Sequence, residues 1–326
     1  MKRALTRAAI GALAIVLVAV LGIVGVAQAR WDRTFDDAPV PTLVASTDST
    51  VIERGRYLAY GPAYCAACHT ANGMSSRVDA GDELPLSGGH VWDVPPGVLR
   101  SANLTPDSAT GIGRYTDAQL VRAIRHGVRH DGRAMLPFMA YQNMSDDDVV
   151  AVISFLRSQA PVSNRVADHD PTLLGKAVLA FLIKPKGPEG TPPARSPVGT
   201  SVERGRYLAE SVSDCAGCHT QRSSMDGSFT GPRFAGGGSF SIESKPGYSI
   251  ITPNLTPDSA TGRIAHWTED QFVARFRARR LIKESPMPWG PLRKMSDDDL
   301  RSIYRHLRTL APVSNPTPGG FQKKKG

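Results

Sequence analysis

The chain contains two copies of one sequence pattern, and this duplication constrains its fold more than any other feature. The segment ERGRYLA at residues 53–59 recurs 150 residues later at 203–209. Three more blocks recur at an offset of 151 residues: NLTPDSATG from Asn103, MSDDD from Met144 and APVSN from Ala160. A nearly constant offset over separated blocks indicates two copies of one domain. We predict domains over residues 50–164 and 200–315, a linker over 165–199 and a solvated basic tail over 316–326.

Helix-start signals recur at matching places in both copies. Threonine followed three residues later by Glu or Gln forms a capping box, which we expect at Thr50, Thr116, Thr200 and Thr268. Ser145 and Ser296 each precede three aspartates, which favour the first turn of a helix because of its dipole. Little of the sequence reads as strand. The predicted fold class is therefore all-α, with two tandem domains of helices and long loops. In the linker, the apolar stretch 173–183 predicts a short helix that packs between the domains or lies on a membrane, and we favour packing.

The N-terminal segment is apolar and long enough to cross a bilayer. Residues 8–29 carry no charge, and at about 1.5 Å per residue they match a hydrocarbon core of about 30 Å. Lys2, Arg3 and Arg7 precede this segment, which keeps the N-terminus in the cytoplasm and places the rest of the chain outside. Residues 1–29 are thus a signal anchor or a signal peptide cleaved near Ala29, and we favour the anchor. Either way, the body lies on the periplasmic side of an inner membrane.

All four cysteines belong to two Cys-x-x-Cys-His motifs, Cys65–Cys68–His69 and Cys215–Cys218–His219. This pattern is typical of covalent c-type haem attachment, because both thiols reach one porphyrin edge while the imidazole binds the iron. A thioredoxin-like redox pair needs a βαβ setting, which the sequence does not indicate. A four-thiolate zinc site leaves both histidines without a role. We therefore predict two covalently bound haems c, each with iron.

A distal methionine must come from far along the chain to reach the opposite face of each ring. Met74 and Met225 follow the histidines too closely, and Met144 and Met295 precede helices as core residues. In the first copy the loop candidates Met135 and Met139 remain, whereas Met287 is the candidate of the second copy. The other histidines are expected in surface or loop positions. They are His90, His126, His130, His169, His266 and His306.

These motifs resemble the di-haem members of the class I cytochrome c family. More narrowly, the chain is similar to the cytochrome subunits that accept electrons from membrane-bound alcohol, aldehyde or gluconate dehydrogenases, although those subunits often carry three haems. The resemblance covers both domains and rests on the NLTPD, G-x-G-x-Y-T and MSDDD blocks. It implies Met139 and Met287 as iron ligands. Ala140 replaces the proline that follows the ligand in the family, so Met135 is kept as the alternative.

These features predict an electron-transfer protein rather than an enzyme, because an iron held by both His and Met has no open position for a substrate. Its partners are expected to be a membrane or periplasmic dehydrogenase and a terminal oxidase or another cytochrome. The alternative is a di-haem peroxidase. The net charge of +9 does not indicate nucleic-acid binding, because no basic stripe interleaved with aromatic residues appears. Asn103, Thr105, Asn254 and Thr256 either bind a haem propionate or cap turns.

Overall fold

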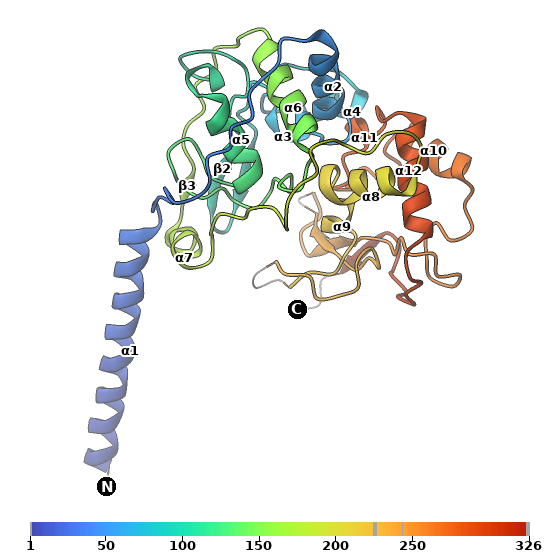
Figure 1. The fold of residues 1–326 in the computed structure, drawn as a ribbon. Coiled ribbons are helices and arrows are strands. Elements are labelled where there is room, and N and C mark those ends of the chain that lie inside the picture. Colours follow the sequence, from blue (N-terminus) through green and yellow to red (C-terminus); the bar gives the residue numbers. More distant parts are fainter. Residues whose placement is uncertain (1, 224–226, 243, 324–326) are drawn as a thin grey trace.

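The computed structural model describes residues 2–223, 227–242 and 244–323, and it is mostly helical (Figure 1). A long N-terminal helix projects from a body in which residues 50–164, here called the first half, lie beside residues 200–315, the second half. The α-helices are α1 (Lys2–Arg30), α2 (Ser49–Tyr60), α3 (Ala66–His69), α4 (Ser75–Ala80), α5 (Asp117–His126), α6 (Asp146–Ser158), α7 (Leu173–Phe181), α8 (Val202–Tyr207), α9 (Cys215–Cys218), α10 (Glu269–Arg277), α11 (Trp289–Leu292) and α12 (Asp297–Arg308). A 3₁₀-helix, η1, spans Ile112–Arg114, and a π-helix, η2, spans Leu208–Val212.

Two small antiparallel sheets correct the all-α expectation. The first has the order β1 (Val91–Val94), β2 (Gly97–Arg100), β3 (Asp170–Pro171), and the second has the order β4 (Ser239–Ser241), β5 (Tyr248–Ile251), β6 (Phe321–Lys323). Each is a hairpin joined by a strand from distant sequence, with Trp92 opposite Leu99 and Phe240 opposite Ile250. Strands this short contain too few alternating apolar and polar residues to be recognised from the sequence. Strand β6 shows that residues 321–323 of the predicted tail form regular structure, although Phe321 and Lys323 are exposed, whereas Lys324 and Lys325 lie outside the described residues.

The helix caps agree with the prediction in part. Thr116 and Thr268 form the expected capping boxes with Gln119 and Gln271. Helix α2 instead takes Asp48 as its N-cap, and α8 takes Ser201, so the boxes predicted at Thr50 and Thr200 are wrong. The true caps are neighbours that also carry a side-chain oxygen able to accept from the first free N–H groups.

The repeated blocks ERGRYLA and MSDDD recur because they contact each other. A Cβ on Gly55 would lie 1.9 Å from the backbone oxygen of Ala151, and one on Gly205 would lie 1.8 Å from that of Ser302. Only glycine therefore lets α2 cross α6, and α8 cross α12, this closely. In the first half, Nε of Arg54 also donates to Oδ1 of Asp148 at 2.8 Å.

The blocks NLTPD and APVSN are also partners. Nδ2 of Asn103 donates to the carbonyl of Val162 at 2.8 Å, and Nδ2 of Asn254 donates to that of Val313 at the same distance. Both asparagines are buried, and each also accepts from the threonine two residues later. The recurring letters thus mark matched hydrogen bonds that close each half.

The two halves exchange hydrogen bonds through a pair of tyrosines. Tyr57 donates to Oδ2 of Asp299 at 2.6 Å, and Tyr207 donates to Oδ2 of Asp148 at 2.7 Å. Each tyrosine oxygen also accepts from the backbone N–H of the serine at the partner helix's N-cap, at 3.0 Å from Ser296 and 3.1 Å from Ser145. Since these residues correspond under the duplication, the contact is reciprocal.

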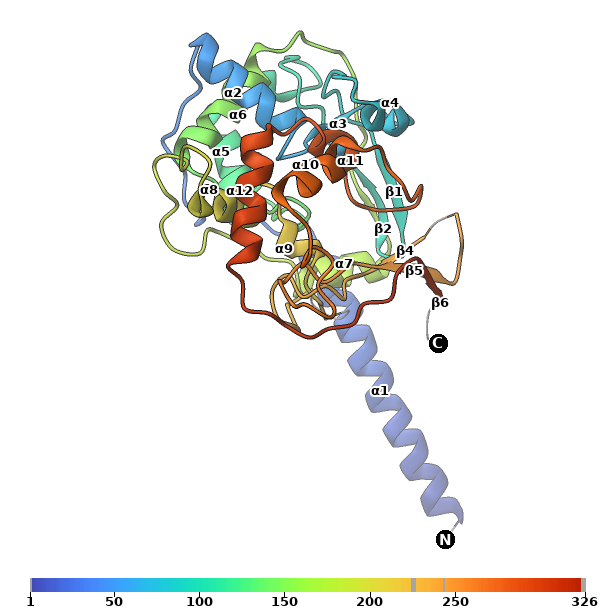
Figure 2. The ribbon, with the colours of Figure 1, turned by 90° about the vertical axis from the view of Figure 1, so that its right-hand side faces the viewer.

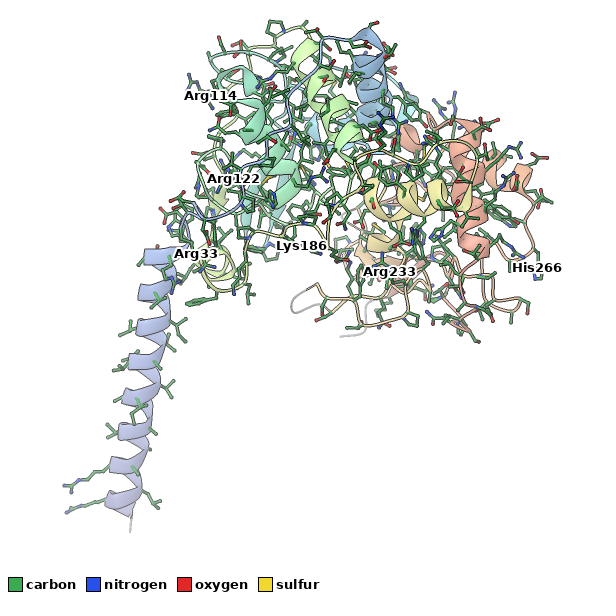
Figure 3. All side chains as sticks on the ribbon, viewed as in Figure 1. Arg33, Arg114, Arg122, Lys186, Arg233 and His266 are labelled. Carbon is green, nitrogen blue, oxygen red and sulfur yellow. The ribbon has the colours of Figure 1, made fainter. Side chains whose placement is uncertain are left out.

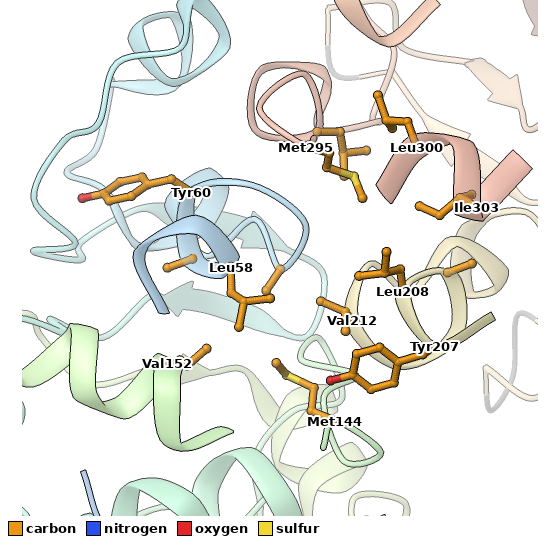
Figure 4. Close-up of a cluster of buried hydrophobic side chains, with 14 of the residues drawn as sticks. Leu58, Tyr60, Met144, Val152, Tyr207, Leu208, Val212, Met295, Leu300 and Ile303 are labelled. Atoms are coloured by element: carbon orange, nitrogen blue, oxygen red, sulfur yellow. The ribbon is translucent and has the colours of Figure 1, made fainter. Parts of the chain in front are cut away.

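One continuous cluster of buried apolar side chains crosses between the halves. Met144 and Met295 belong to it at 2% and 1% exposure, which confirms them as core residues. Figure 4 shows Met144 of the first half beside Tyr207 of the second. The tyrosine exchange therefore lies within a shared core rather than between two separate ones.

We predict that Tyr57→Phe and Tyr207→Phe each lower the free energy of unfolding by about 1–3 kcal/mol, because each leaves a buried carboxylate short of one donor. Denaturant unfolding of the purified protein measures this loss. Tyr248→Phe, in β5 and away from the exchange, is the matched control. Equal stability of all three variants would contradict the role of the exchange.

Candidate functional site

Each Cys-x-x-Cys-His motif occupies one helical turn. The backbone N–H of His69 donates to the carbonyl of Cys65 at 2.8 Å, and that of His219 donates to Cys215 at 2.9 Å. In each motif the residue before the first cysteine has a positive φ, 38° at Tyr64 and 41° at Asp214. This turns the chain sharply after the preceding helix, and the following turn gathers both cysteines and the histidine.

The two motif histidines are oriented in the same way. Nδ1 of His69 lies 2.9 Å from the carbonyl oxygen of Ala102, and Nδ1 of His219 lies 3.1 Å from that of Pro253. A carbonyl can only accept, so Nδ1 carries the proton and Nε2 is left with a lone pair for a metal. Burial lowers the pKa of both histidines, which favours the neutral form that binds metals.

The motif cysteines do not have the lowered pKa of redox-active thiols. Burial raises the pKa of Cys65 and Cys215 to about 12 and that of Cys218 to about 11. A catalytic thiol needs the opposite shift. Among the described residues, which include all four cysteines, no group of three or more His, Cys, Asp or Glu side chains is placed to hold a metal ion. Both alternatives to haem attachment lose support.

A cavity of about 830 Å³ adjoins the first motif. Cys65, Cys68 and His69 line it together with Met135 and Met139, so the structure brings both predicted methionine candidates to the same space as the histidine. Much of the wall is apolar, including Leu99, Ile112, Leu120, Ile124 and Leu136. Met74, which the sequence analysis discounted, instead precedes α4 as its N-cap residue.

Arginines line the same cavity and were not identified from the sequence. Figure 3 shows Arg33 where α1 meets the body and Arg114 on the first half. The arginines of the lining are Arg33, Arg100, Arg114, Arg129 and Arg133. No sequence signal could have found them, because they come from separate segments and one precedes the repeat. The cavity can therefore hold a large apolar group with acidic substituents.

The asparagine and threonine pairs serve the fold. Thr105 is fully buried, and its hydroxyl donates to Oδ1 of Asn103 at 2.7 Å. In the second half Thr256 donates in the same way to Asn254 at 2.8 Å. The structure shows the capping of loops, and Asn103 also lines the first cavity.

In the second half, His219 is buried and Met287 is half-buried against the shared core. Met287 lies just before α11, whose first residue Trp289 donates its backbone N–H to the Met287 carbonyl at 2.8 Å. Met225 lies outside the described residues. The expectation that His306 is a surface or loop residue is wrong. It lies in α12, is 4% exposed and has its Nε2 3.2 Å from Oε1 of Glu210.

A glycine missed by the sequence analysis supports the orientation of His69. Gly88 has φ +70°, and a Cβ there would lie 2.4 Å from both the carbonyl carbon and the oxygen of Ala102, the acceptor of His69. Gly236 makes the matching approach to Pro253 and Asn254. The two glycines are 148 residues apart, so they fall outside the offset of 150 or 151 residues that relates the repeated blocks.

We expect Gly88→Ala to destabilise the protein more than Gly73→Ala. Both glycines have positive φ, which costs an alanine roughly 1–2 kcal/mol, but a Cβ on Gly73 meets nothing within 4 Å. The difference between the two free energies of unfolding isolates the clash with the Ala102 carbonyl. Equal losses in the two variants would show that this carbonyl moves aside freely.

Comparison with known proteins identifies a family model described as "Cytochrome C oxidase, cbb3-type, subunit III", which matches residues 52–156. A nicotinate dehydrogenase subunit of Pseudomonas putida is 30% identical, over 92% of this chain and 24% of that protein. The cytochrome c subunit of the quinone alcohol dehydrogenase of Gluconacetobacter polyoxogenes is 31% identical, over 84% of this chain and 58% of its own. A di-haem c-type cytochrome of Cereibacter sphaeroides is 29% identical, over 76% of this chain and 82% of that protein. The chain thus spans about a quarter of the first of these relatives and somewhat over half of the second.

Proposed function

We propose that this chain binds two haems c covalently and carries single electrons, because it is a c-type cytochrome related to the cytochrome c subunits of membrane dehydrogenases. The observation that carries this proposal is the matched setting of His69 and His219. Each follows a Cys-x-x-Cys pair, and each is held through Nδ1 by a corresponding carbonyl. Residues 50–164 and 200–315 are then two tandem class I cytochrome c domains.

In this proposal each half supplies one complete ligand set. Cys65 and Cys68 form thioethers and His69 binds iron in the first half, with Met139 as the distal ligand and Met135 as the alternative. Cys215, Cys218, His219 and Met287 do the same in the second half. When bound, each haem iron supplies a centre that takes up and releases one electron.

The first cavity fits such a group. Its apolar wall accommodates a porphyrin face. Arg129 and Arg133 pair with Asp131, so Arg33, Arg100 and Arg114 are the arginines that offer cationic partners to the two propionates. The Ala102 carbonyl holds the His69 ring in place, and such outer contacts make an imidazole a better ligand.

The packing of the halves supports electron exchange between the two sites. Burial raises the pKa of Tyr64 well above its ordinary value, and the neighbouring Asp214, Cys218 and Cys215 add to this shift. Tyr64, Cys65 and Cys215 also pack against the one buried apolar cluster that crosses between the halves. We infer that the two haems lie near enough for single electrons to pass between them.

The relatives indicate the class of partner. They are named as subunits of alcohol, gluconate and fructose dehydrogenases, so we infer that this chain accepts electrons from a membrane or periplasmic dehydrogenase. It delivers them to a terminal oxidase or another cytochrome. Within the described residues, Leu5–Arg30 is the one helix long and apolar enough to span a membrane. As an anchor, it holds the body on the periplasmic side of the inner membrane.

The number of haems is tested by removing the attachment cysteines in pairs. Chain produced in a host that matures c-type cytochromes should carry two haems by mass after denaturation. The variants Cys65→Ala/Cys68→Ala and Cys215→Ala/Cys218→Ala should each retain one. A native chain with a single haem, or none, would contradict the proposal.

The distal ligands are tested by the near-infrared band that a Met–iron(III) bond produces. Met139→Ala and Met287→Ala should each remove about half of the band, because each iron contributes one such bond. Met135→Ala is the matched control and should leave the band intact. If Met135→Ala halves the band while Met139→Ala does not, the first ligand is Met135.

The same spectrum separates electron transfer from the alternative, a di-haem peroxidase. A peroxidase needs one five-coordinate, high-spin iron to bind its substrate. The full band in the native protein excludes that enzyme. A high-spin signal from half of the iron would favour it.

A further inference from the structure

Helix α7 exposes an apolar face that the protein body does not cover. Leu173, Leu174, Phe181 and Leu182 are 49%, 56%, 43% and 59% exposed. Leu174 and Phe181 are seven residues apart and so share one face of the helix. Residues 173–184 also contain two lysines and no acid. Scattered exposed apolar residues are ordinary, but several on one short helix indicate a contact surface.

The same helix is fastened to the end of α1. Nζ of Lys176 donates to Oε1 of Gln28 at 2.9 Å and lies 5.3 Å from the centre of the Trp31 ring. Ala27 is the buried residue of this last part of α1, at 1% exposure. Farther along, Arg33 donates to the carbonyl of Ile183 at 3.2 Å. Figures 1 and 2 both place α7 at the end of α1 that meets the body.

The inner face of α7 belongs to the body. A Cβ on Gly175 would lie 1.8 Å from the carbonyl oxygen of Pro96, at the turn between β1 and β2. Leu179 and Ile183 line the first cavity. Helix α7 therefore packs on the first half and on α1, and the expected packing between the domains is wrong. On its other side, Leu174 and Phe181 stay largely exposed.

The length of α1 indicates where α7 would lie relative to a bilayer that α1 crosses. The uncharged residues 8–29 span about 33 Å as a helix, against a hydrocarbon core of about 30 Å. A bilayer crossed by this segment therefore ends close to Ala27 and Gln28, the level at which Lys176 is fastened. Trp31 follows directly, and tryptophan favours this boundary.

We propose that α7 is an interfacial helix whose outer face enters the headgroup region of the phospholipid bilayer spanned by α1. Such helices bury their apolar face about 5–10 Å into the boundary between headgroups and acyl chains. The exposed Lys184, at the end of the apolar stretch, then lies within reach of lipid phosphates. The contact fixes the tilt of the body and places the first cavity directly above the membrane. It depends on retention of α1 and not on the haem assignment.

Photolabelling of the full chain tests this contact. The protein is reconstituted into vesicles of phosphatidylethanolamine and phosphatidylglycerol that contain a phospholipid with a diazirine at the glycerol end of its acyl chain. After illumination and proteolysis, mass spectrometry locates the label. We expect label in α1 and in residues 173–182, and several-fold less around Val198, an apolar linker residue that is 83% exposed.

The variant Leu174→Gln/Phe181→Gln should lose the label in α7 and keep it in α1, whereas Val198→Gln should change neither. Far-ultraviolet circular dichroism shows whether each variant is folded. If the double variant is not folded, the labelling pattern of the unaltered chain decides the case. Label confined to α1 overturns the proposal, because α7 is then covered by water, another protein or a second copy. An unlabelled α1 overturns it as well, since the anchor would not be in the bilayer.

Discussion

Two buried carboxylates, Asp148 and Asp299, hold the structure together by accepting hydrogen bonds from both halves of the chain. Each takes an arginine from its own half and a tyrosine from the other. They are 1% and 2% exposed, so neither can replace a lost donor with bulk water, and a buried charge without partners is costly. The exchange thereby specifies one arrangement of the halves within a shared apolar core.

This arrangement positions the candidate site because the helices that carry the tyrosines lead into the cysteine motifs. Helix α2 ends at Tyr60, just before Cys65, and η2 continues α8 as far as Val212, just before Cys215. Any rotation of one half against the other would therefore move one motif relative to its counterpart. On the other side of the first half, α7 lies between the first cavity and the end of α1. The elements that position the two Cys-x-x-Cys-His motifs and those that adjoin the end of α1 thus pack into one body.

The two halves differ at some positions that correspond under the repeat, and there they make different side-chain contacts. Tyr60 and Phe155 meet edge to face in the first half, with ring centres 5.6 Å apart. At the corresponding positions the second half has Glu210 and His306, an acid and an imidazole. A minor part of the first cavity wall also comes from outside the repeat, including Trp31, Arg33 and Ile183. A shared ancestor sequence therefore accounts for the attachment motifs but not for the surroundings of each site.

The sequence alone determined those features of the protein that depend on residues close together along the chain. Cys-x-x-Cys-His is a local motif because its three key residues share one helical turn. The offset between copies, the apolar N-terminal helix and the Thr116 and Thr268 caps likewise depend on neighbours along the chain. Tertiary structure decided the rest: the short strands, the Asp48 and Ser201 caps, the burial of His306, the arginines of the cavity and the tyrosine exchange. These features join residues far apart in sequence, and their free energy comes from burial and from donors meeting acceptors across the fold. No local pattern records such pairings, because either partner alone is an ordinary residue.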